Sequence, residues 1–158
     1  MNFGKRFAIP EPVRGVFALV LVFAFSAGCA NHSKQASQDK KLNDVASAIH
    51  ARSGRVVRDF SSGGGLEGPR TLGIITFRSG STLQVVNQQI REAVAAGYSN
   101  SPTPPCGDAT QGCSFNDPQD MPRLTLESVP ANGRTRSGIS VPDGKTCLIV
   151  TLSIRSSS

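Results

Sequence analysis

The sequence is poor in the residues from which most catalytic and metal sites are built. Its 158 residues include two His, four Cys, one Tyr and no Trp, and charged residues make up 18% of the chain, below the ~25% usual for globular proteins. No apolar run reaches the ~20 residues of a membrane-spanning helix, which excludes a polytopic membrane protein. The sequence instead contains 16 Gly and 10 Pro, which indicate many turns.

A short apolar segment follows a basic N-terminus. Lys5, Arg6 and Arg14 precede Gly15–Phe25, which reads GVFALVLVFAF. As a helix this segment would be ~16 Å long, about half the thickness of a bilayer core. Such a segment is typical of an export signal and not of a membrane anchor, so we expect the chain to be exported.

The next four residues, Ser26-Ala27-Gly28-Cys29, resemble the lipobox of bacterial lipoproteins. The resemblance implies that the Cys29 thiol receives diacylglycerol, that further acylation follows, and that signal peptidase II cleaves before Cys29. Ser26 stands where Leu is common in the motif. Residues 1–28 are then a lipoprotein signal peptide, and the protein is held on the exported side of the cell membrane, or on the outer membrane if the host has two. The alternative is ordinary secretion with a coincidental Cys.

Two segments of different character follow the signal peptide. Residues 29–37 begin with the lipidated Cys29 and are polar and aperiodic, so we expect a flexible tether. Residues 38–155 show hydrophobic periodicity and are long enough to bury a core of their own. We therefore predict a single folded domain over residues 38–155.

Helical periodicity predicts two helices within this domain. The first is expected over Gln38–Ser53, between Ser37 as N-cap and Gly54 as the stop. The second is expected over Ser81–Ala96, which opens with a capping box and places Gln89 on the hydrated side. The apolar positions that recur at helical spacing are Leu42, Val45 and Ile49 in the first helix, and Leu83, Val86, Ile90 and Val94 in the second.

Alternating and β-branched segments predict about five strands. Residues between Asn100 and Pro122 show no such pattern. The order of helices and strands predicts an α+β fold, in which two amphipathic helices pack on one face of a mainly antiparallel sheet. The expected strands are Arg55–Phe60, Thr71–Arg78, Arg123–Val129, Arg134–Val141 and Lys145–Ile154.

Three cysteines remain if Cys29 carries the lipid, and thiols of exported proteins tend to form disulfides. Cys106 and Cys113 bracket a short polar loop, which favours a local disulfide between them and leaves Cys147 as a buried thiol. The alternative is a disulfide between Cys147 and one of these two cysteines, which would join the loop to the last strand. Both pairings stay open, because sequence alone does not determine connectivity.

No familiar catalytic or cofactor-binding motif is present. The sequence contains neither GxSxG nor HExxH, and its two His have no visible partners. Asp108, Asp117 and Asp120 lie in the Pro-rich loop without the spacing of a calcium loop, and we interpret them as turn-forming residues. We therefore expect no metal, no cofactor and, for an exported protein, no nucleic acid.

These observations favour a membrane-anchored, non-catalytic binding or structural module of the cell envelope. The net charge is +6 for the whole chain and +4 once residues 1–28, which carry three basic and one acidic residue, are removed. This mildly basic surface suggests an envelope protein, an anionic wall polymer or anionic lipid headgroups as partner, unless the charge serves only solubility. The alternative from another class is a small envelope enzyme that uses Cys147 or the loop of Asp108, Asp117 and Asp120.

Overall fold

The computed structural model describes residues 32–64, 68–99, 102, 106, 112–115 and 120–154. The chain divides into two compact units, Met1–Lys34 and Gln35–Ser158, and the second contains the sheet. Cys29 and the expected signal peptide lie outside the described residues. Within the part of the chain that is described, no helix is both long and apolar enough to cross a membrane.

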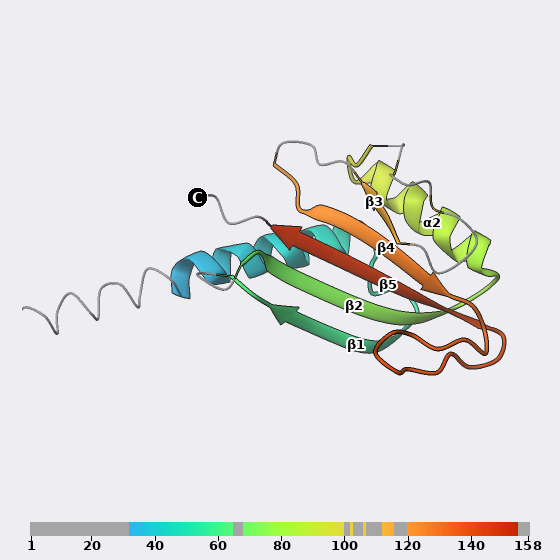
Figure 1. Cartoon of the computed structure of the whole chain (residues 1–158). Coiled ribbons are helices and arrows are strands. Elements are labelled where there is room, and N and C mark those ends of the chain that lie inside the picture. The colour runs from blue at the N-terminus through green and yellow to red at the C-terminus, as the bar shows by residue number, and fades with distance from the viewer. Residues whose placement is uncertain are drawn as a thin grey trace, which may run out of the picture. The chain divides into compact units, whose positions relative to one another are not determined.

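Five antiparallel strands form one sheet in the order β1-β2-β5-β4-β3 (Figure 1). The two longest strands, β2 and β5, lie side by side and pair over all 10 residues of each. The described helices are residues 32–48 and α2 (Thr82–Ala95). The predicted α+β class is confirmed. The strands are β1 (Arg55–Ser62), β2 (Arg70–Ser79), β3 (Cys113–Phe115), β4 (Arg123–Val129) and β5 (Lys145–Ile154).

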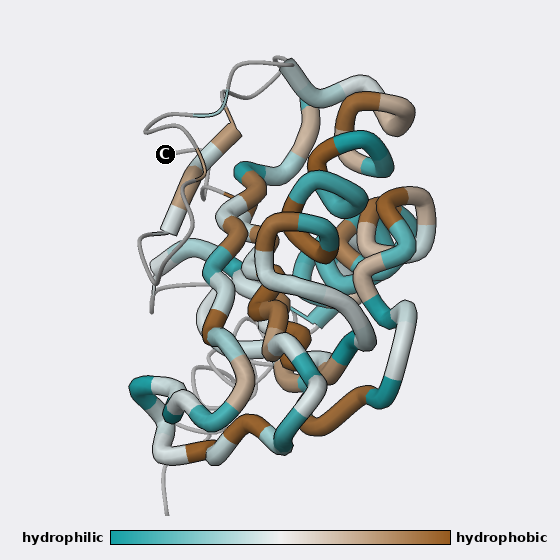
Figure 2. Tube along the Cα trace, turned by 90° about the vertical axis from the view of Figure 1, so that its right-hand side faces the viewer, coloured by the Kyte–Doolittle hydropathy of each residue, from teal (hydrophilic) through white to brown (hydrophobic). Residues whose placement is uncertain are grey.

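The main core lies between the sheet and the helices. Alternate side chains of β2, β4 and β5 point to one face, because successive residues of a strand face opposite sides. Hydrophobic and hydrophilic residues alternate along the coils of the helices (Figure 2), as expected of helices with one buried face. The buried residues that make up this core include Leu42, Ala46, Ile49, Leu72, Ile74, Val85, Val86, Leu124, Leu126, Leu148, Val150 and Leu152.

The first helix starts earlier than predicted. Residues 32–37, which we expected to belong to the tether, are helical. They contain neither Gly nor Pro, so nothing in them breaks a helix that is stabilised by packing further along. Polarity and lack of periodicity therefore did not distinguish an exposed helical turn from a tether.

The first helix also ends earlier than predicted, at residue 48 and not near Ser53. His50 adopts a φ of 50°, and the N–H of Ala51 donates to the carbonyl of Ala46 at 2.9 Å. This bond and the left-handed residue define a Schellman-type end. His50, and not Gly54, therefore stops the helix, and its side chain is exposed at the turn.

The position of α2 is confirmed, but its buried face is rotated from the predicted one. Leu83, expected in the core, is 51% exposed, and Ile90 is only partly buried against the core. Gln89, expected on the hydrated side, is fully buried. Its amide is satisfied inside the protein, because it donates to the carbonyl of Ile49 at 2.6 Å and accepts from Arg78 at 2.8 Å.

The number of strands is as predicted, but one of the five is a different segment. Arg134–Val141 does not form a strand: it turns at Gly138, and Arg134 and Ser140 form a single bridge. The segment instead packs Ile139 and Val141 onto the sheet. The fifth strand is β3, within the region that showed no pattern, and it pairs with β4.

Candidate functional site

The face of the sheet away from the helices is only partly covered, and we call it the outer face. Its register places Phe60 opposite Gly73, and Arg58 opposite Ile75. A Cβ atom on Gly73 would lie 2.5 Å from the Phe60 ring, so the absence of a side chain at Gly73 lets the ring lie on the sheet. The Arg58 guanidinium is 5.3 Å from the centre of this ring, within cation–π range. Phe60 nevertheless remains 44% exposed.

A second, small cluster covers one end of the outer face. Ile75, Val129 and Cys147 are buried there beneath Val141, and Ile139 packs against them. The covering residues belong to the segment between β4 and β5. This segment leaves the neighbouring end of β2 open, and that end carries the most promising concave site of the described chain.

This site, which we call the Arg55–Lys145 pocket, has a volume of about 370 Å³. Arg55 pairs with Phe77, and Lys145 pairs with Ser79, so the two cations flank the end of β2 from the strands on either side. The Lys145 ammonium donates to Ser79 Oγ at 2.8 Å. The residues that line the pocket are Gly54, Arg55, Phe77, Ser79, Pro142 and Lys145.

The chemistry available in the pocket is that of anion binding. Its lining offers one guanidinium, one ammonium and one hydroxyl, together with the apolar walls of Phe77 and Pro142. No carboxylate, thiol or imidazole lines it. Such a site can hold an anionic group by charge and hydrogen bonds.

The predicted disulfide between Cys106 and Cys113 is present, with a Cα–Cα distance of 5.0 Å. Cys113 is the first residue of β3 and is buried, and Cys106 packs against the main core. The disulfide therefore fastens the loop to the edge of the sheet at β3, a strand of only 3 residues. Its role is structural, because both sulfurs are consumed in the bond.

Replacing both Cys106 and Cys113 by Ala is expected to lower the free energy of unfolding by about 2–3 kcal/mol, since the open loop regains conformational entropy in the unfolded chain. Denaturant unfolding of the mature protein with and without dithiothreitol measures this cost. Reduction should destabilise the wild type and leave the double variant unchanged. Equal stability of the oxidised and reduced wild type would show that the disulfide contributes nothing.

Cys147 is a free thiol and is fully buried beneath the covering segment of the outer face. Burial raises the pKa of this thiol from 9.0 to about 11, because the thiolate is poorly solvated there. A nucleophilic cysteine needs the opposite shift and an exposed sulfur. Cys147 therefore has neither of these two properties of a nucleophilic cysteine.

The buried thiol predicts a pH dependence of stability. Above about pH 9 the thiol ionises in the unfolded chain, whereas in the folded protein it stays protonated up to about pH 11. Stability is therefore lost as the pH rises through this interval, by up to ~1.4 kcal/mol per pH unit. Cys147→Ala lacks this term, so its stability deficit relative to wild type should shrink between pH 9 and pH 10.5 in denaturant titrations. A constant deficit would mean that the thiol titrates normally.

Of the remaining predicted site residues the structure describes only Asp120. Asp108 and Asp117 lie outside the described residues, and Asp120 is exposed in a turn. Among the residues that the structure describes, no three His, Cys, Asp or Glu side chains lie close enough to hold a metal ion.

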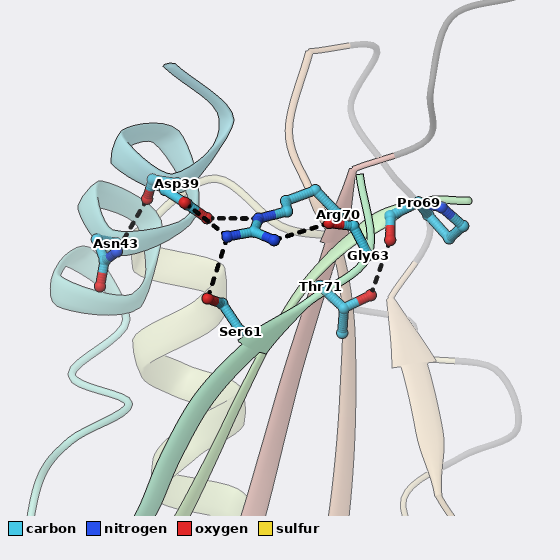
Figure 3. A network of polar contacts seen from close by, with 7 residues as sticks. All are labelled: Asp39, Asn43, Ser61, Gly63, Pro69, Arg70 and Thr71. Carbon is cyan, nitrogen blue, oxygen red and sulfur yellow. Dashed lines mark hydrogen bonds and ion pairs between the residues drawn. The ribbon is translucent and has the colours of Figure 1, made fainter. Parts of the chain in front are cut away.

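Two arginines form polar networks that the sequence did not reveal. Arg70 binds both carboxylate oxygens of Asp39 at 2.7 Å and also donates to the Gly63 carbonyl at 2.7 Å (Figure 3). The Arg70 guanidinium lowers the pKa of Asp39. This network ties the first helix to the β1–β2 hairpin and exposes no reactive group, so we interpret it as structural.

The second network surrounds Arg78, which is almost fully buried. Its guanidinium donates to Gln89 and to the carbonyls of His50 and Ala51, and Glu92 lies 3.8 Å away. Burial lowers the pKa of Arg78, and the charge of Glu92 opposes this effect. Successive side chains of β2 alternate between the two faces of the sheet, and this alternation places Arg78 on the core side. It was the one signal in the sequence that this arginine points inward.

Comparisons of the chain with protein-family models, curated proteins and solved structures returned no match. The functional argument therefore depends on the residues and geometry described above. The sequence analysis singled out neither Arg55 nor Lys145. The signal available was weak: each is a basic residue at the first position of a predicted strand.

Proposed function

We propose that this protein is an exported lipoprotein, anchored through Cys29, and that its folded domain is a non-catalytic module that binds an anionic component of the cell envelope. The observation that carries the proposal is the Arg55–Lys145 pocket, in which two cations flank the end of β2 and no acid lines the walls. The exposed ring of Phe60 lies on the same face. A basic pocket on the same face as an exposed aromatic ring is a surface suited to recognition of an anionic ligand.

The anchoring part of the proposal is supported by the N-terminal sequence. The basic N-terminus, the apolar segment Gly15–Phe25 and the lipobox-like Ser26-Ala27-Gly28-Cys29 occur in the order that lipoprotein processing requires. Lipid attachment would confine the module to a membrane surface, where even a weak binding site gains from local concentration.

The non-catalytic part is supported by the environment of the reactive groups. The Cys147 thiol is buried and has a raised pKa, and Asp120 is exposed outside any cluster of ligating side chains in the described chain. The pocket itself supplies two cations, a hydroxyl and apolar walls, and neither a carboxylate nor an imidazole lines it. These features suit binding and are unfavourable for chemistry.

Site-specific photocrosslinking in living cells tests the binding function. Phe60 on the outer face and Arg91 on the exposed side of α2 are replaced, in separate strains, by p-benzoylphenylalanine. We expect a crosslinked adduct after irradiation at Phe60 and none at Arg91, since only the first lies on the proposed binding face. Adducts of equal yield at both positions, or none at Phe60, would contradict a partner on the outer face.

A further inference from the structure

The Arg55–Lys145 pocket brings two cationic side chains together in one concave site. Among the described residues, neither Arg55 nor Lys145 makes an ion pair. Arg52 and Arg70, in contrast, are neutralised by Asp59 at 2.6 Å and by Asp39 at 2.7 Å. The pocket therefore retains two positive charges that no carboxylate within the described residues neutralises.

We propose that this pocket binds the phosphate group of a sugar-phosphate or polyol-phosphate unit, such as one unit of a phosphate-containing envelope polymer. The proposal rests on the proposed function and names the ligand class of the same site. It follows from the position of the two cations, from the shape of the pocket and from the nature of its walls.

The register of the sheet places the cations on both sides of one strand. Arg55 on β1 lies opposite Phe77, and Lys145 on β5 lies opposite Ser79. Their backbones are thus about 10 Å apart across β2 and about 7 Å apart along it, which gives a separation of about 12 Å. Two long side chains can close this gap over the strand. A small anion above Ser79 can therefore contact both cations at once.

Phosphate fits this pair of cations better than carboxylate does. A planar guanidinium binds two phosphate oxygens side by side, and an ammonium acts as a point charge from another direction. A phosphate group has oxygens that point in enough directions to serve both cations and the Ser79 hydroxyl. A single carboxylate has only two oxygens, both in one plane, so once it is bound side by side to the guanidinium it is less well placed to reach the ammonium and the hydroxyl as well.

The rest of the pocket is suited to a compact ring or polyol. Phe77 and Pro142 provide apolar walls, against which the C–H face of a sugar can pack. The volume of about 370 Å³ is near the lower end of the range for small-molecule sites. It accommodates one phosphorylated sugar unit, with the chain of a polymer continuing into solvent.

The nearest acids do not neutralise the site. Asp143 lines the adjoining pocket and not this one. Its Oδ1 accepts from the N–H of Gly144 at 3.0 Å and from Asn132 Nδ2 at 3.4 Å, which holds it in its own turn. Glu127 lies on β4, opposite Ile149 and beyond β5.

Binding to defined small molecules tests the proposal with the full-length lipidated protein in a neutral detergent. Glucose 1-phosphate, glucose, glucuronate and inorganic phosphate are titrated separately and followed by ligand-observed NMR. We expect saturable binding of glucose 1-phosphate, competition by inorganic phosphate, no binding of glucose, and at least about tenfold weaker binding of glucuronate. Glucuronate that binds as tightly as glucose 1-phosphate would overturn the preference for phosphate.

Charge-removing variants locate the site. Arg55→Gln and Lys145→Gln should each weaken glucose 1-phosphate binding by about tenfold or more, since each removes one charge-assisted contact. Arg91→Gln removes the same charge from the exposed side of α2 and should leave the affinity unchanged. An equal loss of affinity in all three variants would mean that net charge alone attracts the ligand, and would overturn the assignment of the binding site to this pocket.

A further titration with phospholipids distinguishes a sugar phosphate from a lipid headgroup as the ligand. Water-soluble dihexanoylphosphatidylglycerol and dihexanoylphosphatidylcholine are titrated separately into the same detergent-solubilised protein. Binding to phosphatidylglycerol that depends on Arg55, with no binding of glucose 1-phosphate, would assign the pocket to lipid headgroups and overturn the sugar-phosphate ligand. If glucose 1-phosphate does not bind but Phe60 still crosslinks in cells, the ligand class is wrong and the binding module stands.

Discussion

Replacing Arg78 by Met is expected to lower the free energy of unfolding by about 3–5 kcal/mol, which is the usual cost of leaving a buried charge partner unpaired. The guanidinium donates to Gln89 Oε1 at 2.8 Å and to two carbonyls at the end of the first helix. Without it these acceptors lose their donor, and Glu92, whose Oε2 is buried without a hydrogen-bond partner, loses its counter-charge. Denaturant unfolding followed by circular dichroism measures the loss.

Two further variants separate this effect from loss of side-chain volume. Arg91→Met makes the same chemical change on the exposed side of α2 and should alter stability by no more than ~0.5 kcal/mol. Adding Glu92→Gln to Arg78→Met should recover part of the loss, because the unpaired charge is removed. If Arg78→Met is as mild as Arg91→Met, the network does not hold the two helices to β2.

Replacing Cys29 by Ala is expected to move the protein out of the membrane fraction entirely, or to leave it as an unprocessed precursor. Stable attachment requires more than one acyl chain. The resemblance to a lipobox implies that Cys29 carries all of these chains. Fractionation of cells and the intact mass of the product measure the change. Cys147→Ala is the matched control, since it removes a thiol that carries no lipid and should leave the distribution unchanged. A Cys29→Ala protein of unaltered size in the membrane fraction would contradict lipidation.

The elements that local chemistry specifies were predicted well. The capping box of α2 is present, with Ser81 accepting from Gln84 N–H and Gln84 Oε1 accepting from Ser81 N–H. The two faces of β5 alternate as expected, with Leu148 and Val150 in the main core and Cys147 on the opposite side. In each case the determining contacts are made within a few residues of sequence.

The sequence-based predictions were wrong where contacts with residues distant in the sequence outweigh the local hydrophobic pattern. Gln89 is buried because Arg78 and the carbonyl of Ile49 satisfy its amide, and neither is near it in sequence. The three residues of β3 form a strand because they pair with β4 and are fastened by the disulfide at Cys113. Hydrophobic periodicity cannot register partners of this kind.

The difference between local and distant contacts also decides how much of the candidate site the sequence could predict. The sequence by itself predicted the α+β class, the helix that α2 forms and, as the favoured of two pairings, the local disulfide, because each depends on composition, periodicity or short-range spacing. The export signal lies outside the described residues and stays a prediction. Only the tertiary structure brought Arg55 and Lys145 to the two sides of β2. They begin strands that are far apart in the chain, and the order β1-β2-β5 makes those strands neighbours of β2. Strand order follows from packing of the whole sheet on its helices, so no local pattern contains it.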